Sequence, residues 1–396
     1  MMSLLDRLLK PSKDSYARKL LGALRSQGDL RQWNYDKAGF RLEAQGQSKG
    51  STVIHLGTIY AEFCQTPRKE RNNILLRTAM IALSEIPATF EAAKSSLMPA
   101  IKHGDERGMI MIDTGPEHSM LFQPLCGQLE TTVVHDTEHG MSRLSEKQLA
   151  EWGVSHEQLL SAAMDNLRAR SDEPMQRISP GLYLSNWQDY LDASRMLLTD
   201  LLYRHAISGT PVVMVPNRTC LLLAGDQDLP ALTRMLEIAT EVLQDPRPLS
   251  PQMMRWEKDH WAEFSPPELA DSLFRLRFDD IANGYAVQKK LMDEMHERQG
   301  IDIFVASFMA FSNSQSDRPF SVATWTEGVH ALLPVTDSVI LGRQGSSDML
   351  TVGWNDLLRV CSDLMRRTAD IPARYEVTAY PDESRLKELA ACRVEL

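Results

Sequence analysis

The sequence predicts an α+β protein in which several helix–antiparallel strands–helix modules pack side by side. Strand-like segments come in pairs joined by short turns, which is typical of antiparallel pairing. Helices with apolar side chains at three- and four-residue steps stand before and after these pairs. This order recurs about four times along the chain, without residue-level repetition at a fixed period. We therefore expect modules at 1–86, 87–180, 181–262 and 263–396.

The first module is predicted as a helix, a hairpin and a second helix. Residues 16–27 favour a helix that ends at Gly28. Segments 39–44 and 52–56 alternate polar and apolar residues around a turn-forming stretch, which indicates a hairpin. Thr66 followed by Pro67 is typical of a helix start, and we expect this helix to continue towards Leu83.

The second module combines two strands with a pair of helices. Segments 108–113 and 131–134 are small or apolar runs, which we expect to be buried strands. Ser145 and Ser155 are each followed three residues later by glutamine, the capping-box pattern that satisfies free amides at a helix start. The sequence therefore predicts two consecutive helices here, the first ending at Gly153.

The third and fourth modules follow the same order. In the third we expect a helix over 190–201, strands at 212–215 and 220–224, a helix over 232–243 and a proline-rich loop over 245–251. In the fourth we expect a helix over 285–297, strands near 303–311, 320–325, 338–341 and 350–352, a helix over 355–366, a strand near 374–379 and a short final helix.

Composition excludes several classes of function. The 396 residues include 43 Lys+Arg and 53 Asp+Glu, for a formal net charge of −10, so the chain lacks the positive field that supports nucleic-acid binding. The five cysteines are scattered without a paired C-x-x-C, which suits reduced thiols in the cytoplasm. No apolar run approaches the ~18 residues that a membrane span needs. We expect a cytoplasmic protein without a transmembrane segment, a nucleic-acid partner or a cofactor.

A leucine stripe at the N-terminus allows a different interpretation. Leu4, Leu5, Leu8 and Leu9 fall on one face of a predicted helix. Such a face could lie on a membrane surface or in the groove of a partner. We favour docking on the body of the protein itself, because two turns with little net charge make a weak membrane anchor.

Five blocks in order resemble the uncharacterised bacterial YtpQ-like family, a domain of unknown function. The blocks are IYAEFCQTPRKER (59–71), AEWGVSHEQLLSAAMDNL (150–167), YLDASRMLL (190–198), VVMVPNRTCLLLA (212–224) and LSPQMMRW (249–256). They span roughly residues 50–262. Thr219 stands where the family pattern has an acid. The resemblance implies a bacterial cytosolic protein and brings no catalytic residues.

Two groups of residues are candidates for binding. Asn217 and Arg218 lie at the end of the hairpin predicted in the third module, and arginine offers a planar fork of donors to a carboxylate or a phosphate. The alternative is a turn whose arginine pairs locally with Asp226 or Asp228. Trp256 and Trp261 lie in a polar stretch, where tryptophans can mark a binding surface or can cap a hydrophobic core.

One cluster contains metal-capable groups. His135, Asp136 and His139 supply imidazole and carboxylate ligands of the kind that zinc prefers. They follow a predicted strand and precede Gly140, so a solvated turn is the competing interpretation, and the H-E-x-x-H order of metalloproteases is absent.

The leading hypothesis is a non-enzymatic cytosolic interaction or adaptor protein, chaperone-like or immunity-like, with a protein partner of unknown identity. It is motivated by modules without an assembled catalytic signature, since no nucleophile elbow or phosphate loop occurs in the sequence. The alternative is a hydrolase with an acid and histidine site around His135, Asp136 and His139, with or without a metal.

Overall fold

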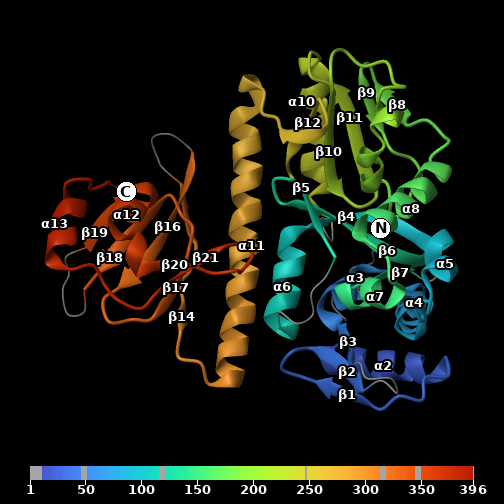
Figure 1. Cartoon of the computed structure of the whole chain (residues 1–396), viewed down its shortest axis with the longest axis horizontal. Helices are drawn as coiled ribbons and strands as arrows, with labels where there is room; N and C mark the ends of the chain where they lie inside the picture. The colour runs from blue at the N-terminus through green and yellow to red at the C-terminus, as the bar shows by residue number, and fades with distance from the viewer. Residues whose placement is uncertain are drawn as a thin grey trace.

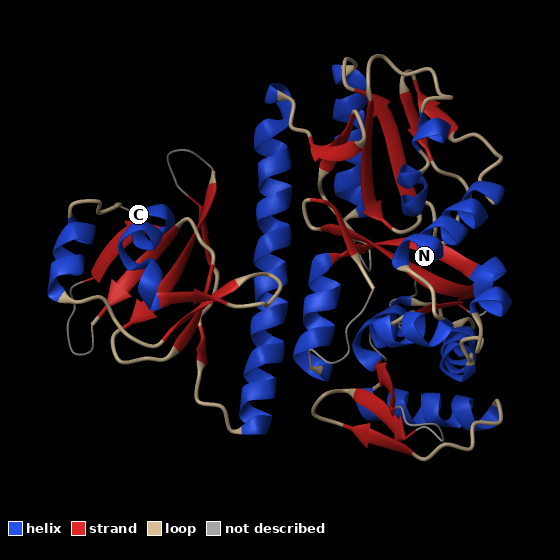
Figure 2. Ribbon diagram, in the orientation of Figure 1, coloured by secondary structure: helices blue, strands red, loops and turns tan. Residues whose placement is uncertain are grey.

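A computed structural model describes residues 11–45, 51–115, 121–138, 140–245, 248–312, 318–343 and 349–395. Helices pack against predominantly antiparallel sheets throughout this part of the chain, which confirms the predicted α+β class (Figure 2). Figure 1 shows a long helix, α11 (Ala270–Gln299), standing between the C-terminal sheets and all the preceding elements.

The first module places its helices on a small antiparallel sheet of order β1-β2-β3. Tyr16, Leu20 and Leu24 of the first helix are buried against Leu42 and Phe63. The second helix begins later than predicted, at Arg71, and a further helix directly follows β3. The elements are α2 (Lys13–Ser26), β1 (Trp33–Asp36), β2 (Arg41–Gln45), β3 (Ser51–His55), α3 (Leu56–Gln65) and α4 (Arg71–Leu83).

The second module is built on a sheet of order β4-β6-β5, with β7 also pairing β6. The predicted helix pair is confirmed. Ser155 and Gln158 form a complete capping box, and the Ser145 side chain accepts from the amide of Gln148. The elements are α5 (Phe90–Ala93), β4 (Leu97–His103), α6 (Gly104–Thr114), β5 (Gln123–Cys126), β6 (Leu129–Thr137), β7 (Gly140–Arg143), α7 (Glu146–Trp152) and α8 (His156–Ala169).

The strand predicted at 108–113 is wrong, because these residues belong to helix α6. His103 caps this helix by accepting from the amide of Asp105, and Asp105 and Glu106 place negative charge in its first turn. The run Met-Ile-Met-Ile suggests a strand, but the helix cap and the acidic first turn just before it favour a helix.

The third module is an antiparallel sheet of order β13-β12-β10-β11-β9-β8. Its central strands β10 and β11 are buried on both faces. Helix α10 packs on one face, and on the other the core continues into Ile101, Cys126 and Leu129 of the second module. The elements are β8 (Gln176–Ser179), β9 (Leu182–Leu184), α9 (Thr199–Leu202), β10 (Pro211–Asn217), β11 (Cys220–Gly225), α10 (Leu229–Val242), β12 (Met253–Glu257) and β13 (His260–Glu263).

The predicted helix over 190–201 is also wrong. This stretch forms a 3-10 turn, Ala193–Leu197, followed by the short α9. Asp192 and Arg195 are completely buried here and hold the chain through side-chain hydrogen bonds, which compete with a regular helix.

The C-terminal residues form sheets of order β14-β17-β21-β20 and β15-β16-β18-β19 beside α11. β14 with β17 and β16 with β18 are parallel pairs, an exception to the predicted antiparallel pairing. The elements are β14 (Phe304–Val305), β15 (Met309–Ser312), β16 (Pro319–Thr326), β17 (Ala331–Pro334), β18 (Ser338–Gly342), β19 (Met349–Gly353), α12 (Trp354–Cys361), β20 (Met365–Arg367), β21 (Arg374–Val377) and α13 (Glu383–Ala390).

Within the described part of the chain, no helix combines the length and the apolar character needed to cross a bilayer.

Candidate anion-binding site

Arg218 lies in the tight turn between β10 and β11 and contacts a residue far away in sequence. Its Nη2 is 3.1 Å from Oε2 of Glu106, in the first turn of α6. The predicted local pairing is wrong, because Asp226 accepts from the amide of Thr210 and Asp228 caps α10. Arg218 instead joins the third module to the second.

Asn217 shapes the turn that carries Arg218. Its Oδ1 accepts from the amide and the hydroxyl of Thr219, at 3.0 and 3.1 Å. The carbonyl of Arg218 accepts from the amide of Ala193 at 3.2 Å. Both contacts fix the backbone, so Asn217 positions the neighbouring arginine.

Three positively charged side chains, two from strands and one from a turn, meet at Glu106. Lys102 at the end of β4 places Nζ 3.8 Å from Oε2, Arg143 at the end of β7 forms an ion pair with Oε1, and Arg218 completes the group. We call Lys102, Glu106, Arg143 and Arg218 the Glu106 cluster. Positive charge exceeds negative charge within it.

The two arginines of the Glu106 cluster act on each other. Burial, together with the nearby charge of Arg218, lowers the pKa of Arg143 to about 10. Burial also lowers the pKa of Arg218. Both guanidinium groups stay protonated near neutral pH, and an additional anion would relieve their repulsion.

A small pocket opens beside the Glu106 cluster, between β4, β6, β7 and the start of α6. Arg107 crosses it with a bidentate bond to Glu130, at 2.6 and 3.0 Å, and its guanidinium carbon lies 3.6 Å from the ring centre of the half-exposed Phe122. The lining residues are Lys102, His103, Glu106, Arg107, Leu121, Phe122, Glu130, Thr132, Arg143 and Leu144. The pocket thus offers cations and an aromatic ring.

Trp256 and Trp261 face each other across the β12–β13 hairpin, with ring centres 5.3 Å apart. Trp261 is only 4% exposed, and Trp256 packs against the same core as Val213 and Leu223. Both rings thus cover the hydrophobic core, as in the alternative in which the tryptophans cap a core. Neither ring lines the pocket beside the Glu106 cluster.

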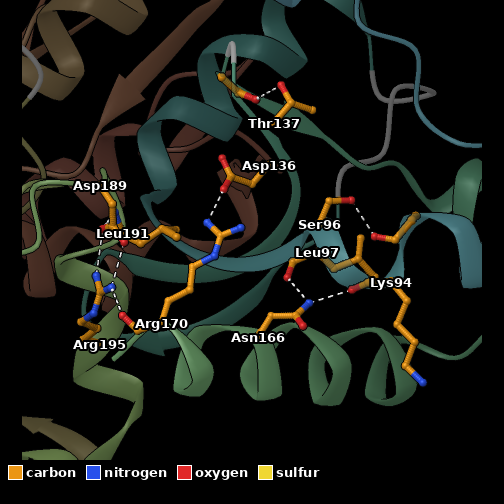
Figure 3. A network of polar contacts seen from close by, with 12 residues as sticks. Lys94, Ser96, Leu97, Asp136, Thr137, Asn166, Arg170, Asp189, Leu191 and Arg195 are labelled. Carbon is orange, nitrogen blue, oxygen red and sulfur yellow. Dashed lines mark hydrogen bonds and ion pairs between the residues drawn. The ribbon is translucent and has the colours of Figure 1, made fainter. Parts of the chain in front are cut away.

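The two described members of the metal-capable cluster, His135 and Asp136, do not converge. His135 and Asp136 are consecutive on strand β6, so their side chains point to opposite faces of the sheet. His135 is buried, which lowers its pKa, while Asp136 pairs with Arg170 of α8 at 2.7 Å (Figure 3). Asp136 and Arg170 belong to a structural polar network that also includes Arg195 and Asp189.

Some candidates fall outside the described residues, namely His139 and the stripe Leu4, Leu5, Leu8 and Leu9. Among the residues that are described, no group of three or more His, Cys, Asp or Glu side chains is arranged to hold a metal ion.

No protein-family model, curated protein or solved structure matches the chain. The resemblance to the YtpQ-like family therefore stays a prediction. Of the Glu106 cluster, sequence reasoning selected Arg218 alone. Lys102 and Glu106 lie four residues apart and share the second module with Arg143, which the sheet of that module brings to Glu106. Only Arg218 arrives from another module, and its distant partner carries no local signal in the sequence.

Proposed function

We propose that this chain is a non-enzymatic, cytosolic interaction protein of the adaptor type, and that the Glu106 cluster recognises an acidic segment of a partner protein. The observation that supports the proposal is the convergence of Lys102, Arg143 and Arg218 on a single shared carboxylate. Arginine forks bind carboxylates with good geometry, and partial burial strengthens such contacts.

The charge of the whole molecule adds selectivity to this site. A chain with a net charge of −10 repels an acidic segment from most of its surface. A local positive cluster on such a body gives the segment one preferred place to dock and fixes its register. Phe122 and the stem of Arg107 add apolar contact at the pocket rim.

A carboxylate from the partner would compete with Glu106 for the same cations. The proposal therefore gives opposite expectations for two variants. Arg218→Gln removes a donor and weakens binding, by roughly tenfold for one good charged contact. Glu106→Gln removes the internal competitor and tightens binding. If the cluster were merely structural, the two substitutions would not change the binding affinity in opposite directions.

The experiment titrates a fluorescein-labelled oligoglutamate peptide against the full chain and follows anisotropy at low salt. Arg204→Gln is the matched control, because Arg204 is an exposed arginine that pairs with Asp200. We expect Arg204→Gln to bind as the wild type does. Equal affinities for the wild type, Arg218→Gln and Glu106→Gln contradict the proposal, as does a wild type that does not bind.

The natural partner is then sought by affinity capture from native cells with the wild type and Arg218→Gln in parallel. We expect a stoichiometric protein that survives about 0.3 M salt on the wild type and is depleted on the variant, since salt at that level screens loose charge contacts. A protein captured equally by both baits does not use this site.

A further inference from the structure

Helices α6 and α11 lie side by side and join the C-terminal part, from α11 onward, to the rest of the chain (Figure 1). His103 stands at the start of α6 and contacts both helices. Its Nδ1 accepts from the amide of Asp105 at 3.2 Å, and its Nε2 lies 3.3 Å from Oδ2 of Asp280 on α11. The neutral imidazole thus caps one helix and bonds the other, whereas a proton on Nδ1 exchanges the cap for an ion pair with the carboxylate of Asp105, whose Oδ2 is 3.6 Å away.

Carboxylates reach His103 from every side of this contact. Asp105 of α6 has Oδ2 3.6 Å from Nδ1, Asp280 comes from α11, and the charge of Glu130 on β6 also acts on the ring. The neighbouring cations are Arg107 of α6, which is held by Glu130, and Lys102 of β4, which pairs with Glu106. The charge of Asp105 also acts on Tyr285 of α11. Asp105 is buried, and its Oδ1 has no hydrogen-bond partner in the described structure.

Glycine lets α6 be packed closely at this point both by α11 and by the loop that precedes β21. A Cβ added to Gly284 of α11 would lie 2.2 Å from Oδ2 of Asp105, and a Cβ added to Gly108 of α6 would lie 2.2 Å from the carbonyl oxygen of Ile371. The backbone of α11 therefore covers Asp105 directly, and separation of the helices would return Asp105 and His103 to water.

We propose that the C-terminal part of the chain, from α11 onward, docks on α6 through a proton-linked contact made by His103, Asp105 and Asp280, which tightens in acid and loosens in alkali. This contact is independent of whether the Glu106 cluster binds a partner. It lets pH set how firmly the two parts of the molecule are held together.

The direction follows from both titrating groups. Burial lowers the pKa of His103, but the hydrogen bond to Asp280 and the surrounding acids outweigh burial and leave this pKa raised. Burial raises the pKa of Asp105; the charge of His103 opposes this effect, but the charges of Asp280 and Glu130 add to it and the pKa stays raised. The docked form thus holds protons more strongly, so docking is fully stabilised below the undocked histidine pKa and weakens as pH rises through the docked one.

The experiment measures hydrogen exchange of the α6 amides in the full chain at about pH 6 and about pH 8, corrected for intrinsic exchange, since histidine titrates between these values. We expect lower protection of α6 at the higher pH, by about tenfold for each unit by which docking raises the histidine pKa. Amides of α8 report on the remaining fold and should not follow this change. Equal protection of α6 at both pH values in the wild type overturns the proposal.

Two variants and a control locate the effect. Asp280→Asn should lower the protection of α6 at about pH 6 and reduce its pH dependence, and His103→Gln should remove the pH dependence that histidine supplies. Asp279→Asn, the same change at the exposed neighbouring residue, should behave as the wild type. A His103→Gln protein that keeps the full pH dependence, with α8 still protected, also overturns the proposal.

Discussion

Arg218 and Glu106 are 112 residues apart in sequence, yet Nη2 of Arg218 lies 3.1 Å from Oε2 of Glu106. This contact places the β10–β11 turn of one module on the first turn of α6 in another. Glu106 also pairs with Lys102 and Arg143, so three positively charged side chains contact its carboxylate. The same carboxylate therefore holds the modules together and competes with any anion that would bind there.

Loss of the Glu106 charge should lower stability while it raises anion affinity. We expect Glu106→Gln to reduce the free energy of unfolding by about 1–2 kcal/mol, because hydrogen bonds to a charged group are lost at a partly buried site. Urea unfolding followed by circular dichroism measures this change. Glu151→Gln, which alters an exposed ion pair with Lys147, is the control and should have little effect. Unchanged stability of Glu106→Gln contradicts a linking role.

The ion pair between Arg195 and Asp189 should make the protein sensitive to acid. Arg195 is completely buried and donates two hydrogen bonds to Asp189, at 2.9 and 2.8 Å. Burial favours the neutral form of Asp189, but the bonds from Arg195 outweigh it and hold the pKa of this carboxyl below its usual value. The stabilisation is therefore present above the unfolded pKa of about 3.9 and is lost as pH falls through the folded pKa.

Asp189→Asn tests this relation. We expect a loss of about 3 kcal/mol at neutral pH, since the variant leaves a buried guanidinium without its counter-ion, and a smaller further loss on acidification than in the wild type. Urea unfolding at several pH values measures both quantities. Asp172→Asn is the control, because Asp172 is exposed. The same acid sensitivity in Asp189→Asn and the wild type would show that other groups cause it.

Two glycines on helices should respond oppositely to alanine. Gly22 of α2 has open space where a Cβ would be, so Gly22→Ala should stabilise the protein by about 0.5–1 kcal/mol through helix propensity. Gly108 of α6 meets the carbonyl oxygen of Ile371 at 2.2 Å from the same position. Gly108→Ala should therefore destabilise the packing of α6 despite its better propensity. Thermal unfolding of both variants checks this, and a stabilising Gly108→Ala contradicts the close approach.

The tryptophan pair should contribute to stability and not to binding. Trp261 is 4% exposed, and we expect Trp261→Ala to cost about 3–5 kcal/mol of unfolding free energy, as for other large core residues. Truncation of the half-buried Trp256 to alanine should reduce the free energy of unfolding by less. Trp256→Ala should bind the oligoglutamate probe with wild-type affinity. Weaker binding of the probe by a fully folded Trp256→Ala protein would show that Trp256 belongs to the binding surface.

Local signals in the sequence were sufficient for several elements. Ser145 and Ser155 satisfy amides within one helical turn, so the pair α7 and α8 is predictable from neighbouring residues alone. Segment 108–113 shows the limit of such reasoning. Its alternating residues suit a buried strand, but the cap at His103 and the close packing of Gly108 on the loop at Ile371 make it a helix.

By itself, the sequence determined the α+β class and the turn that carries Arg218, since both depend on periodicity and on residues a few positions apart. Only the tertiary structure decided what Arg218 contacts. Its charge could pair with a nearby aspartate or with a distant glutamate, and sequence distance does not distinguish them. The packing of β10–β11 against α6 brought Arg218 to Glu106, whose carboxylate already contacts Lys102 and Arg143 of its own module, because burial of the apolar faces of the modules fixes where their charged edges meet.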